Sequence, residues 1–238
     1  MAILVCAHRG ASGYAPENTM KAFRLAHTLG AHACENDVHL TKDGEIVVIH
    51  DSLIDRVSDG SGCVEEMTLE ELRRFDFGEG EKIPTLEECL AFFDASGMAL
   101  NIEIKTGEGM YDPALVDGVG KLVRKFSLSP RVIISSFYHR ALTDMKSRFP
   151  EIRTAVLHGP EIREAGAYAE SLGASFSHPY FACVTPAFME ECSAHGILVN
   201  PWTVDSKGDM RRMADLGCHM LITNYPDLAL RSGQIRGL

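Results

Sequence analysis

The sequence lacks closely spaced cysteine pairs and long apolar runs. Its seven cysteines are scattered, odd in number and never spaced as C-x-x-C. This pattern argues against a disulfide framework or a zinc knuckle and favours reduced thiols. There is no basic segment leading into an apolar run at the N-terminus, and no stretch approaches the about 20 apolar residues that span a bilayer. We therefore expect a cytoplasmic protein with no integral membrane segment.

Positive charge is also scarce. The 33 acidic residues outnumber the 23 Lys and Arg residues, which gives a formal net charge of −10 with histidine neutral. Such a balance argues against nucleic acid or an anionic membrane surface as the main partner. An anionic substrate would need positive charge placed locally, either by a metal ion or by a few Arg and Lys side chains.

What the sequence does contain is a regular alternation of apolar runs and helical patterns. Residues 3–8 form a buried-strand pattern, residues 18–30 a helical one ended by a glycine, and TKDG at 41–44 predicts a hairpin. With that hairpin counted as one unit, the chain has eight strand–helix repeats, which predicts an α/β protein folded as a (β/α)8 TIM barrel. A doubly wound sheet is the alternative, but no G-x-G-x-x-G follows the first strand.

Acidic side chains fall at the ends of two of these predicted strands, where barrel enzymes carry their chemistry. Glu35 and Asp37 are separated by one residue, so both face the same side of a strand, and Glu103 and Lys105 repeat that spacing in NIEIK. Three carboxylates at one mouth repel one another unless a cation neutralises them. All-oxygen donors select a hard ion, so one Mg²⁺ or Ca²⁺ is the expected cofactor. Ordinary solvated acids on a surface strand are the alternative.

Two histidines and two further basic residues join this set. His8 and His50 each end an apolar run before a turn, and such a pair suits proton transfer in both directions. Arg9 and Lys105 supply positive charge suited to a phosphate. Taken together, the residues predict metal-assisted hydrolysis of a phosphoester.

Five segments then resemble the ordered motifs of the glycerophosphodiester phosphodiesterases. They are AHRGASGYAPENT (7–19), ENDVHLTKDGEIVVIHD (35–51), NIEIK (101–105), PWTVD (201–205) and LITNYPD (221–227). The resemblance implies a single TIM-barrel domain over residues 1–238, with a small insertion after the second strand at about 52–82. It also implies hydrolysis of a small-molecule glycerophosphodiester, such as glycerophosphocholine or glycerophosphoethanolamine, to glycerol 3-phosphate and an alcohol.

The same resemblance implies roles for individual residues. Glu35, Asp37 and Glu103 match the metal ligands, His8 and His50 the acid–base pair, and Arg9 and Lys105 the cations on the phosphate side. Asn18 of PENT matches a supporting position near the metal or His8. Trp202 and Phe137 are expected to form an aromatic side of the substrate site, with Tyr180 and Phe181 as weaker candidates.

Two features depart from or add to the family pattern. The family usually ends its last strand with T-D, whereas this chain has Thr223-Asn224, and His178 in SHPYF lies near the predicted mouth. We expect a structural or surface role for His178. Three other functions stay open: a lysophospholipase D or phospholipase C-like enzyme, a non-catalytic glycerophosphodiester-binding protein, and a barrel with a purely structural Ca²⁺. The sequence leaves undecided which histidine is the acid, whether water or a glycerol hydroxyl attacks, and whether the chain forms a homodimer.

Overall fold

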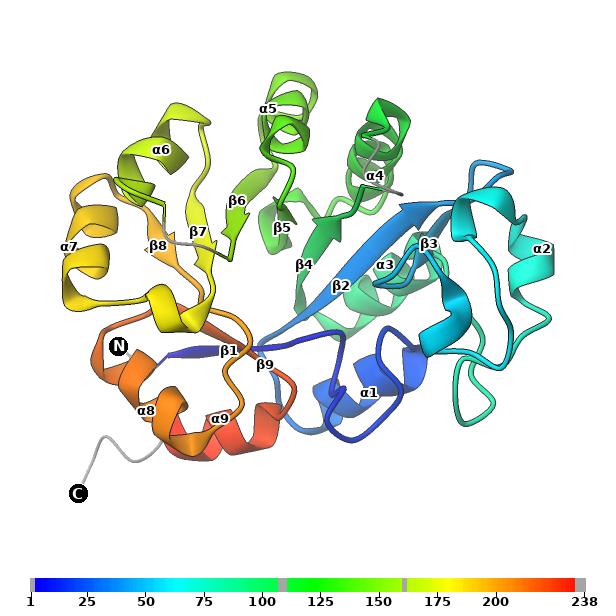
Figure 1. Cartoon of the computed structure of the whole chain (residues 1–238), viewed down its shortest axis with the longest axis horizontal. Helices are drawn as coiled ribbons and strands as arrows, with labels where there is room; N and C mark the ends of the chain where they lie inside the picture. The colour runs from blue at the N-terminus through cyan, green and yellow to red at the C-terminus, as the bar shows by residue number, and fades with distance from the viewer. Residues whose placement is uncertain (1–2, 107–110, 160–161, 234–238) are drawn as a thin grey trace.

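A computed structural model describes residues 3–106, 111–159 and 162–233. Eight parallel strands lie side by side in the order β8-β7-β6-β5-β4-β2-β1-β9, and the helices surround them (Figure 1). The strands are β1 (Leu4–Ala7), β2 (Ala33–Leu40), β3 (Ile46–Val48), β4 (Ala99–Ile104), β5 (Val132–Ser136), β6 (Arg153–His158), β7 (Phe176–Pro179), β8 (Leu198–Val199) and β9 (Met220–Thr223). The predicted TIM barrel is confirmed.

Helices follow the strands in the expected alternation. They are α1 (Met20–Thr28), α2 (Leu69–Leu72), α3 (Leu86–Ser96), α4 (Pro113–Lys125), α5 (His139–Arg148), α6 (Ala165–Ser171), α7 (Pro186–Ala194), α8 (Lys207–Asp215) and α9 (Pro226–Gly233). Thr19 caps α1, because its side chain accepts a hydrogen bond from the Ala22 amide. Among the described residues, no helix combines the length and apolar character needed to cross a bilayer.

The barrel closes between its shortest strand and its last one. The apolar run at 197–204 predicts a full strand, but β8 covers only Leu198–Val199, and Pro201 has no N–H for a sheet ladder. Beyond β8, the Val204 amide still donates to the Ile222 carbonyl at 2.9 Å, and the Ile222 amide donates to Pro201 at 3.0 Å. These hydrogen bonds join the two ends of the sheet.

The hairpin predicted at TKDG is present and leads into the insertion. β3 pairs antiparallel with β2, with Val48 opposite Val38. The chain from 49 to 83 then carries the 3₁₀ helices η1 (Ile54–Arg56) and η2 (Val64–Glu66) and the short helix α2. It packs beside the barrel around its own apolar cluster, which includes Ile54, Leu72 and Phe77.

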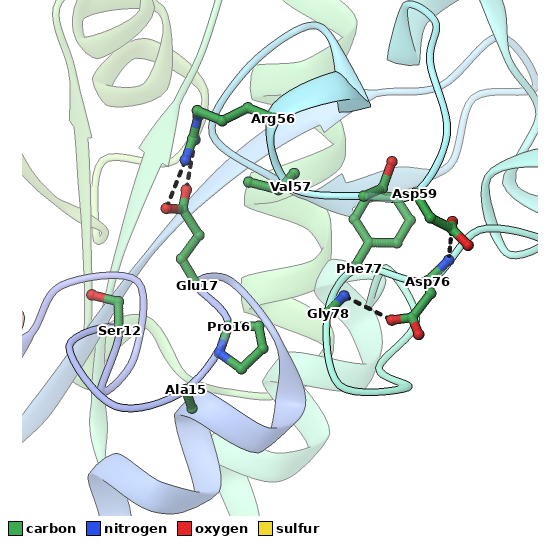
Figure 2. Close-up of a pocket in the computed structure, with 11 residues that line it drawn as sticks. Ser12, Ala15, Pro16, Glu17, Arg56, Val57, Asp59, Asp76, Phe77 and Gly78 are labelled. Atoms are coloured by element: carbon green, nitrogen blue, oxygen red, sulfur yellow. Dashed lines mark hydrogen bonds and ion pairs between the residues drawn. The ribbon is translucent and has the colours of Figure 1, made fainter.

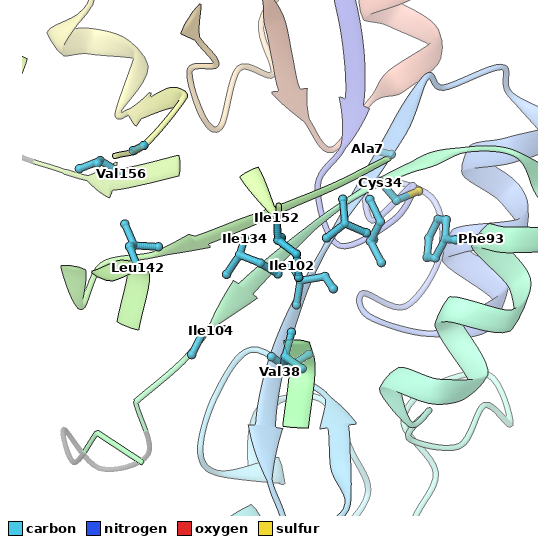
Figure 3. Packing of buried hydrophobic residues seen from close by; sticks show 14 of the residues in the cluster. Ala7, Cys34, Val38, Phe93, Ile102, Ile104, Ile134, Leu142, Ile152 and Val156 are labelled. Atoms are coloured by element: carbon cyan, nitrogen blue, oxygen red, sulfur yellow. The ribbon is translucent and has the colours of Figure 1, made fainter. Parts of the chain in front are cut away.

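Side chains alternate between the two faces of each strand, so the core residues form one group between the strands and the helices and another inside the barrel. Residues such as Cys34, Val38 and Ile102 face outward and pack with Phe93 against the helices (Figure 3). The inward-facing residues in the lower barrel are apolar, namely Cys6, Ala33, Ile133, Ala155, Phe176, Met220 and Ile222. Because side chains alternate, the residues after Ala33 on the same face of β2 are Glu35 and Asp37. The carboxylates Glu35 and Asp37 therefore lie directly above an apolar layer of the barrel interior.

Candidate active site

The structure brings the predicted site residues together at the C-terminal ends of the strands. A pocket of about 360 Å³ is lined by seven of them, namely His8, Arg9, Glu35, His50, Glu103, Phe137 and Trp202. The remaining two, Asp37 and Lys105, contact this lining through ion pairs. Gly10 lets the chain turn immediately after Arg9, because it has a φ of +78° and a Cβ there would lie 2.7 Å from the Ala22 backbone.

The three carboxylates form a buried cluster. Glu35, Asp37 and Glu103 each offer an oxygen, and these oxygens lie within 4.8 Å of one another. Glu35 Oε2 accepts the Arg9 amide at 2.9 Å, whereas Oε1 is buried with no hydrogen-bond partner. Three carboxylates whose oxygens converge in this way, with Glu35 Oε1 free of hydrogen bonds, fit a hard divalent cation.

Burial and charge set the protonation of this cluster. Burial raises the pKa of Glu35 well above its ordinary value, and the neighbouring Asp37 and Glu103 add to the rise. Burial likewise raises the pKa of Glu103 to about 7, against the opposing effect of Lys105. Burial also disfavours ionised Asp37, but Lys105 and Arg9 outweigh it and lower the pKa of Asp37. Asp37 is therefore the carboxylate that stays ionised without a metal.

The two site cations hold this carboxylate directly. Lys105 Nζ lies 3.0 Å from Asp37 Oδ1 and 2.6 Å from Glu103 Oε1. Arg9 Nε lies 3.5 Å from Asp37 Oδ2. Asn18 adds a hydrogen bond, since its Nδ2 donates to Asp37 Oδ2 at 2.8 Å. Asp37 is thus fixed by three partners that sequence analysis had assigned to the metal or phosphate region.

His8 is oriented by residues from the far end of the chain. Its Nδ1 lies 2.8 Å from Asn224 Oδ1, and the Asn224 amide nitrogen donates to Asp205 Oδ2 at 2.7 Å. Because an amide oxygen only accepts, His8 carries its proton on Nδ1, and Nε2 is left unprotonated 4.0 Å from Glu35 Oε2. Burial, followed by the charge of Arg9, lowers the pKa of His8 to about 4, so the ring is neutral.

Sequence analysis missed the roles of Asn224 and Asp205. The only signal was the departure from T-D, which showed that a carboxylate was absent at position 224. The structure places a carboxylate one hydrogen bond away, on Asp205 of PWTVD.

His50 is linked to the opposite side of the site by a chain of ion pairs. His50 Nδ1 lies 2.5 Å from Asp51, and the other Asp51 oxygen accepts Arg56 Nε at 2.6 Å. Arg56 also binds Glu17 (Figure 2). Glu17 in turn pairs with Arg9 at 2.9 Å. Glu17 and Arg56 form part of the wall of a wider groove of about 960 Å³ between the first loop and the insertion (Figure 2).

Aromatic rings form one side of the pocket. Phe137 and Trp202 meet edge to face with centroids 5.5 Å apart, and Tyr180 lies 5.8 Å from Trp202. Phe137 and Tyr180 are 48% and 40% exposed, so both rings face solvent at the barrel mouth. Phe181 packs on Tyr180 at 4.8 Å and is not among the pocket residues named above.

A structural or surface role is predicted for His178, and the structure excludes only the surface position. Its side chain is 0% exposed and lines the pocket, because β7 points it into the barrel below the mouth. Its carbonyl accepts a hydrogen bond from Trp202 Nε1 at 2.8 Å, which ties the aromatic side to the pocket floor.

This fold and site define an enzyme of phosphodiester chemistry, and comparison with known proteins gives the family. The glycerophosphoryl diester phosphodiesterase family matches residues 8–228. A glycerophosphodiester phosphodiesterase of Caldanaerobacter subterraneus subsp. tengcongensis is 41% identical over 234 residues, which is 95% of this chain and 96% of the relative. One of Bacillus altitudinis is 35% identical and covers 95% and 96%. The chain belongs to the glycerophosphodiester phosphodiesterase family and is an enzyme of that class.

Solved structures of similar proteins share the whole architecture. An Oleispira antarctica phosphodiesterase, solved in complex with the product sn-glycerol-3-phosphate, superposes with a TM-score of 0.91 at 28% identity, covering 96% of each chain. A glycerophosphodiester phosphodiesterase of Parabacteroides distasonis gives a TM-score of 0.88 at 26% identity, covering 100% of this chain and 99% of that one.

Proposed function

We propose that this enzyme hydrolyses glycerophosphodiesters such as glycerophosphocholine and glycerophosphoethanolamine to glycerol 3-phosphate and an alcohol, with one Mg²⁺ or Ca²⁺ bound. The observation that carries the proposal is that two histidines, His8 and His50, line one pocket together with two members of the buried carboxylate cluster. The related Oleispira antarctica enzyme, whose structure holds sn-glycerol-3-phosphate, supports the product class.

Glu35, Asp37 and Glu103 are the residues that would hold the cation. When bound, a divalent cation would polarise a phosphoryl oxygen and neutralise part of the charge that develops on the phosphate. Arg9 and Lys105 lie against the same carboxylates and would face the phosphate from the protein side. Arg supplies paired donors for phosphate oxygens, while Lys acts as a point charge.

The hydrogen bonds of the two histidines assign their roles in this proposal. His8, neutral and unprotonated on Nε2, would accept the proton of the attacking oxygen, which is either water or a glycerol hydroxyl. His50 would deliver a proton to the leaving alcohol oxygen as the bond to phosphorus breaks. Burial lowers the pKa of His50, and Lys105 and Arg9 act in the same direction. Asp37 and the Asp51 carboxylate, which lies 2.5 Å from Nδ1, oppose this fall and favour the protonated form that this step requires.

Release of glycerol 3-phosphate tests the proposal. Both diesters are incubated with the protein in EDTA and then with Mg²⁺ or Ca²⁺ added back, beside Glu35→Ala and the exposed control Glu190→Ala. We expect activity to be lost in EDTA and in Glu35→Ala, to return with one of the ions, and to be normal in Glu190→Ala. Activity that survives both EDTA and Glu35→Ala would overturn the metal mechanism. Activity on lysophospholipids alone would overturn the substrate assignment.

A second prediction concerns the pH dependence set by Asn224. Exchanging the two partners, Asn224→Asp with Asp205→Asn, places a carboxylate directly on His8 Nδ1 and keeps the number of carboxylates unchanged. An anion at that distance favours the charged imidazole and raises the pKa of His8, by about 1 or more. A base must be neutral, so the acid limb of kcat/KM should move to higher pH by a similar amount.

The single variant Asn224→Asp is the control for this exchange. It brings two carboxylates within 2.7 Å, since Asp205 already occupies the other side of residue 224. Two carboxylates at this distance share a proton. The single variant should therefore shift the acid limb of kcat/KM less than the double variant Asn224→Asp with Asp205→Asn does. An unchanged pH profile in the exchanged protein would remove His8 as the base.

We also propose a cytoplasmic location. None of the seven cysteines, all of which lie in the described residues, forms a disulfide, and five of them are buried. Buried thiols behave as small hydrophobic side chains and are typical of proteins in a reducing compartment.

A further inference from the structure

His39 is a buried histidine of β2 that the proposed chemistry does not use. It is 2% exposed, and alternation along the strand places it on the same face as Glu35 and Asp37. Its ring contacts the backbone of His50 on one side and η2 of the insertion on the other. His39 therefore connects the segment that carries a proposed catalytic residue to the insertion.

One contact of His39 holds the backbone of His50. His50 lies two residues beyond Val48, the last residue of β3, so the ladder between β2 and β3 does not extend to it. His39 Nε2 lies 3.1 Å from the His50 carbonyl oxygen. A carbonyl oxygen only accepts, so His39 donates this hydrogen bond.

The other contact of His39 leads into the insertion. His39 Nδ1 lies 2.8 Å from Glu65 Oε1, and Glu65 belongs to η2. Cys63 Sγ donates to the second oxygen of Glu65 at 2.9 Å, which orients the carboxylate. Burial opposes the ionisation of Glu65, but the hydrogen bonds from His39 and Cys63 outweigh it and lower the pKa of Glu65. The ionised carboxylate keeps the His39 ring turned toward His50.

His50 is thus attached to the insertion twice. Arg56 of η1 holds Asp51, the partner of the His50 side chain. Glu65 of η2 holds His39, the partner of the His50 backbone. The insertion acts on the proton-donating side of the site, while the carboxylate cluster lies on β2 and β4.

We infer that Glu65 and His39 are positioning residues for the general acid, because they hold the backbone of His50 where its ring can protonate the leaving alcohol oxygen. This inference rests on the proposed function, in which His50 is that acid. Without Glu65, His39 Nδ1 has lost its acceptor, the ring can turn, and the hydrogen bond to His50 weakens. A displacement of about 1 Å in a catalytic group lowers a rate by about 10²-fold.

The test replaces Glu65 by alanine and compares two substrates of the metal-loaded enzyme. Glycerophosphocholine has a leaving alcohol that needs a proton, whereas the glycerophosphodiester of p-nitrophenol has a leaving group that needs little. We expect kcat for glycerophosphocholine to fall by about 10- to 100-fold with little change in KM. We expect kcat for the p-nitrophenol ester to fall by less than about 3-fold, because the acid contributes little to that reaction.

Two further variants accompany this comparison. Glu65→Gln keeps an acceptor oxygen for His39 and should recover part of the loss on glycerophosphocholine. Glu66→Ala, at the exposed neighbouring position of η2, is the matched control and should equal wild type on both substrates.

A double variant shows whether Glu65 acts through His50. When His50 is already alanine, adding Glu65→Ala should cause no further loss on glycerophosphocholine, because the residue that it positions is absent. A further loss of about 10-fold in the double variant would overturn the positioning role.

The outcomes separate this inference from the proposed function. No release of glycerol 3-phosphate by wild type, or equal losses on the two substrates in His50→Ala, would overturn the function or the acid role proposed above. A normal rate in Glu65→Ala, or equal losses on the two substrates in that variant alone, would overturn the positioning role. The ratio of the two rates in one preparation does not depend on the folded fraction, so a partly folded variant still decides. Glu65→Gln gives the same ratio, with a smaller expected loss, if the alanine variant yields no folded protein.

Discussion

Replacement of His50 by alanine is expected to lower kcat for glycerophosphocholine by about 10²–10⁴-fold, as loss of a general acid does. His8→Ala should show a loss of the same order, because the attacking oxygen then has no base. Release of glycerol 3-phosphate at saturating substrate measures both effects. His195→Ala, a variant at a histidine of α7's C-terminal end outside the pocket, is the matched control and should retain the wild-type rate.

The two histidines can be told apart by the leaving group. A glycerophosphodiester of p-nitrophenol needs little protonation of its leaving group as the bond to phosphorus breaks. With this substrate, His50→Ala should regain most of the rate that it loses on glycerophosphocholine, whereas His8→Ala should regain little. The opposite result would reverse the acid and base roles. A near-normal rate on glycerophosphocholine in either variant would remove that histidine from the mechanism.

Replacement of Asp37 by asparagine is expected to lower the free energy of unfolding by about 3–5 kcal/mol in EDTA, because it removes the buried carboxylate that Lys105 and Arg9 share. Asp37 is 1% exposed, and both Lys105 and Arg9 pair with it. Urea unfolding at pH 7 measures the effect. Glu70→Gln, which breaks an exposed pair with Arg74, should change stability by no more than about 1 kcal/mol.

The difference in the free energy of unfolding between wild type and Asp37→Asn should become smaller as the pH falls. The folded state lowers the pKa of Asp37 below its ordinary 3.8, so the ionised carboxylate stabilises the fold above that pH. The contribution is lost as pH falls toward the folded pKa. The gap between Asp37→Asn and wild type should therefore be full at pH 7 and shrink below about pH 4. A variant as stable as wild type at pH 7 would contradict the counter-ion role.

Much of the fold could be predicted because hydrophobic periodicity and strand-end positions are local. Continuous apolar runs predict the barrel strands, and the two-residue spacing of Glu35 and Asp37 places both side chains on the interior face of β2. The same spacing occurs on β2 and on β4. The polar residues of the two strands are neighbours because the strands pair with Asp37 opposite Glu103. The carboxylate cluster follows from short-range rules.

The remaining features depend on contacts between distant segments, which periodicity does not encode. The His8–Asn224 hydrogen bond joins residues 216 positions apart. The depth of His178 depends on the register of β7 beside β6, where it lies opposite Leu157 inside the barrel. The shortness of β8 reflects Pro201, whose missing N–H interrupts the ladder even though the flanking residues read as a strand.

The bridge through Glu17 and Arg56 has a consequence for how this barrel tolerates redesign. Glu17 belongs to the loop after β1, and Arg56 belongs to the insertion. Arg56 also holds Asp51, the partner of His50. A graft that replaced the insertion would remove Arg56 and leave Glu17 and Asp51 without this partner, unless the first loop were exchanged with it. The first loop and the insertion therefore have to be replaced together in any redesign. They are nevertheless far apart in the sequence, because 32 residues that include β2 and β3 lie between Asn18 and Asp51.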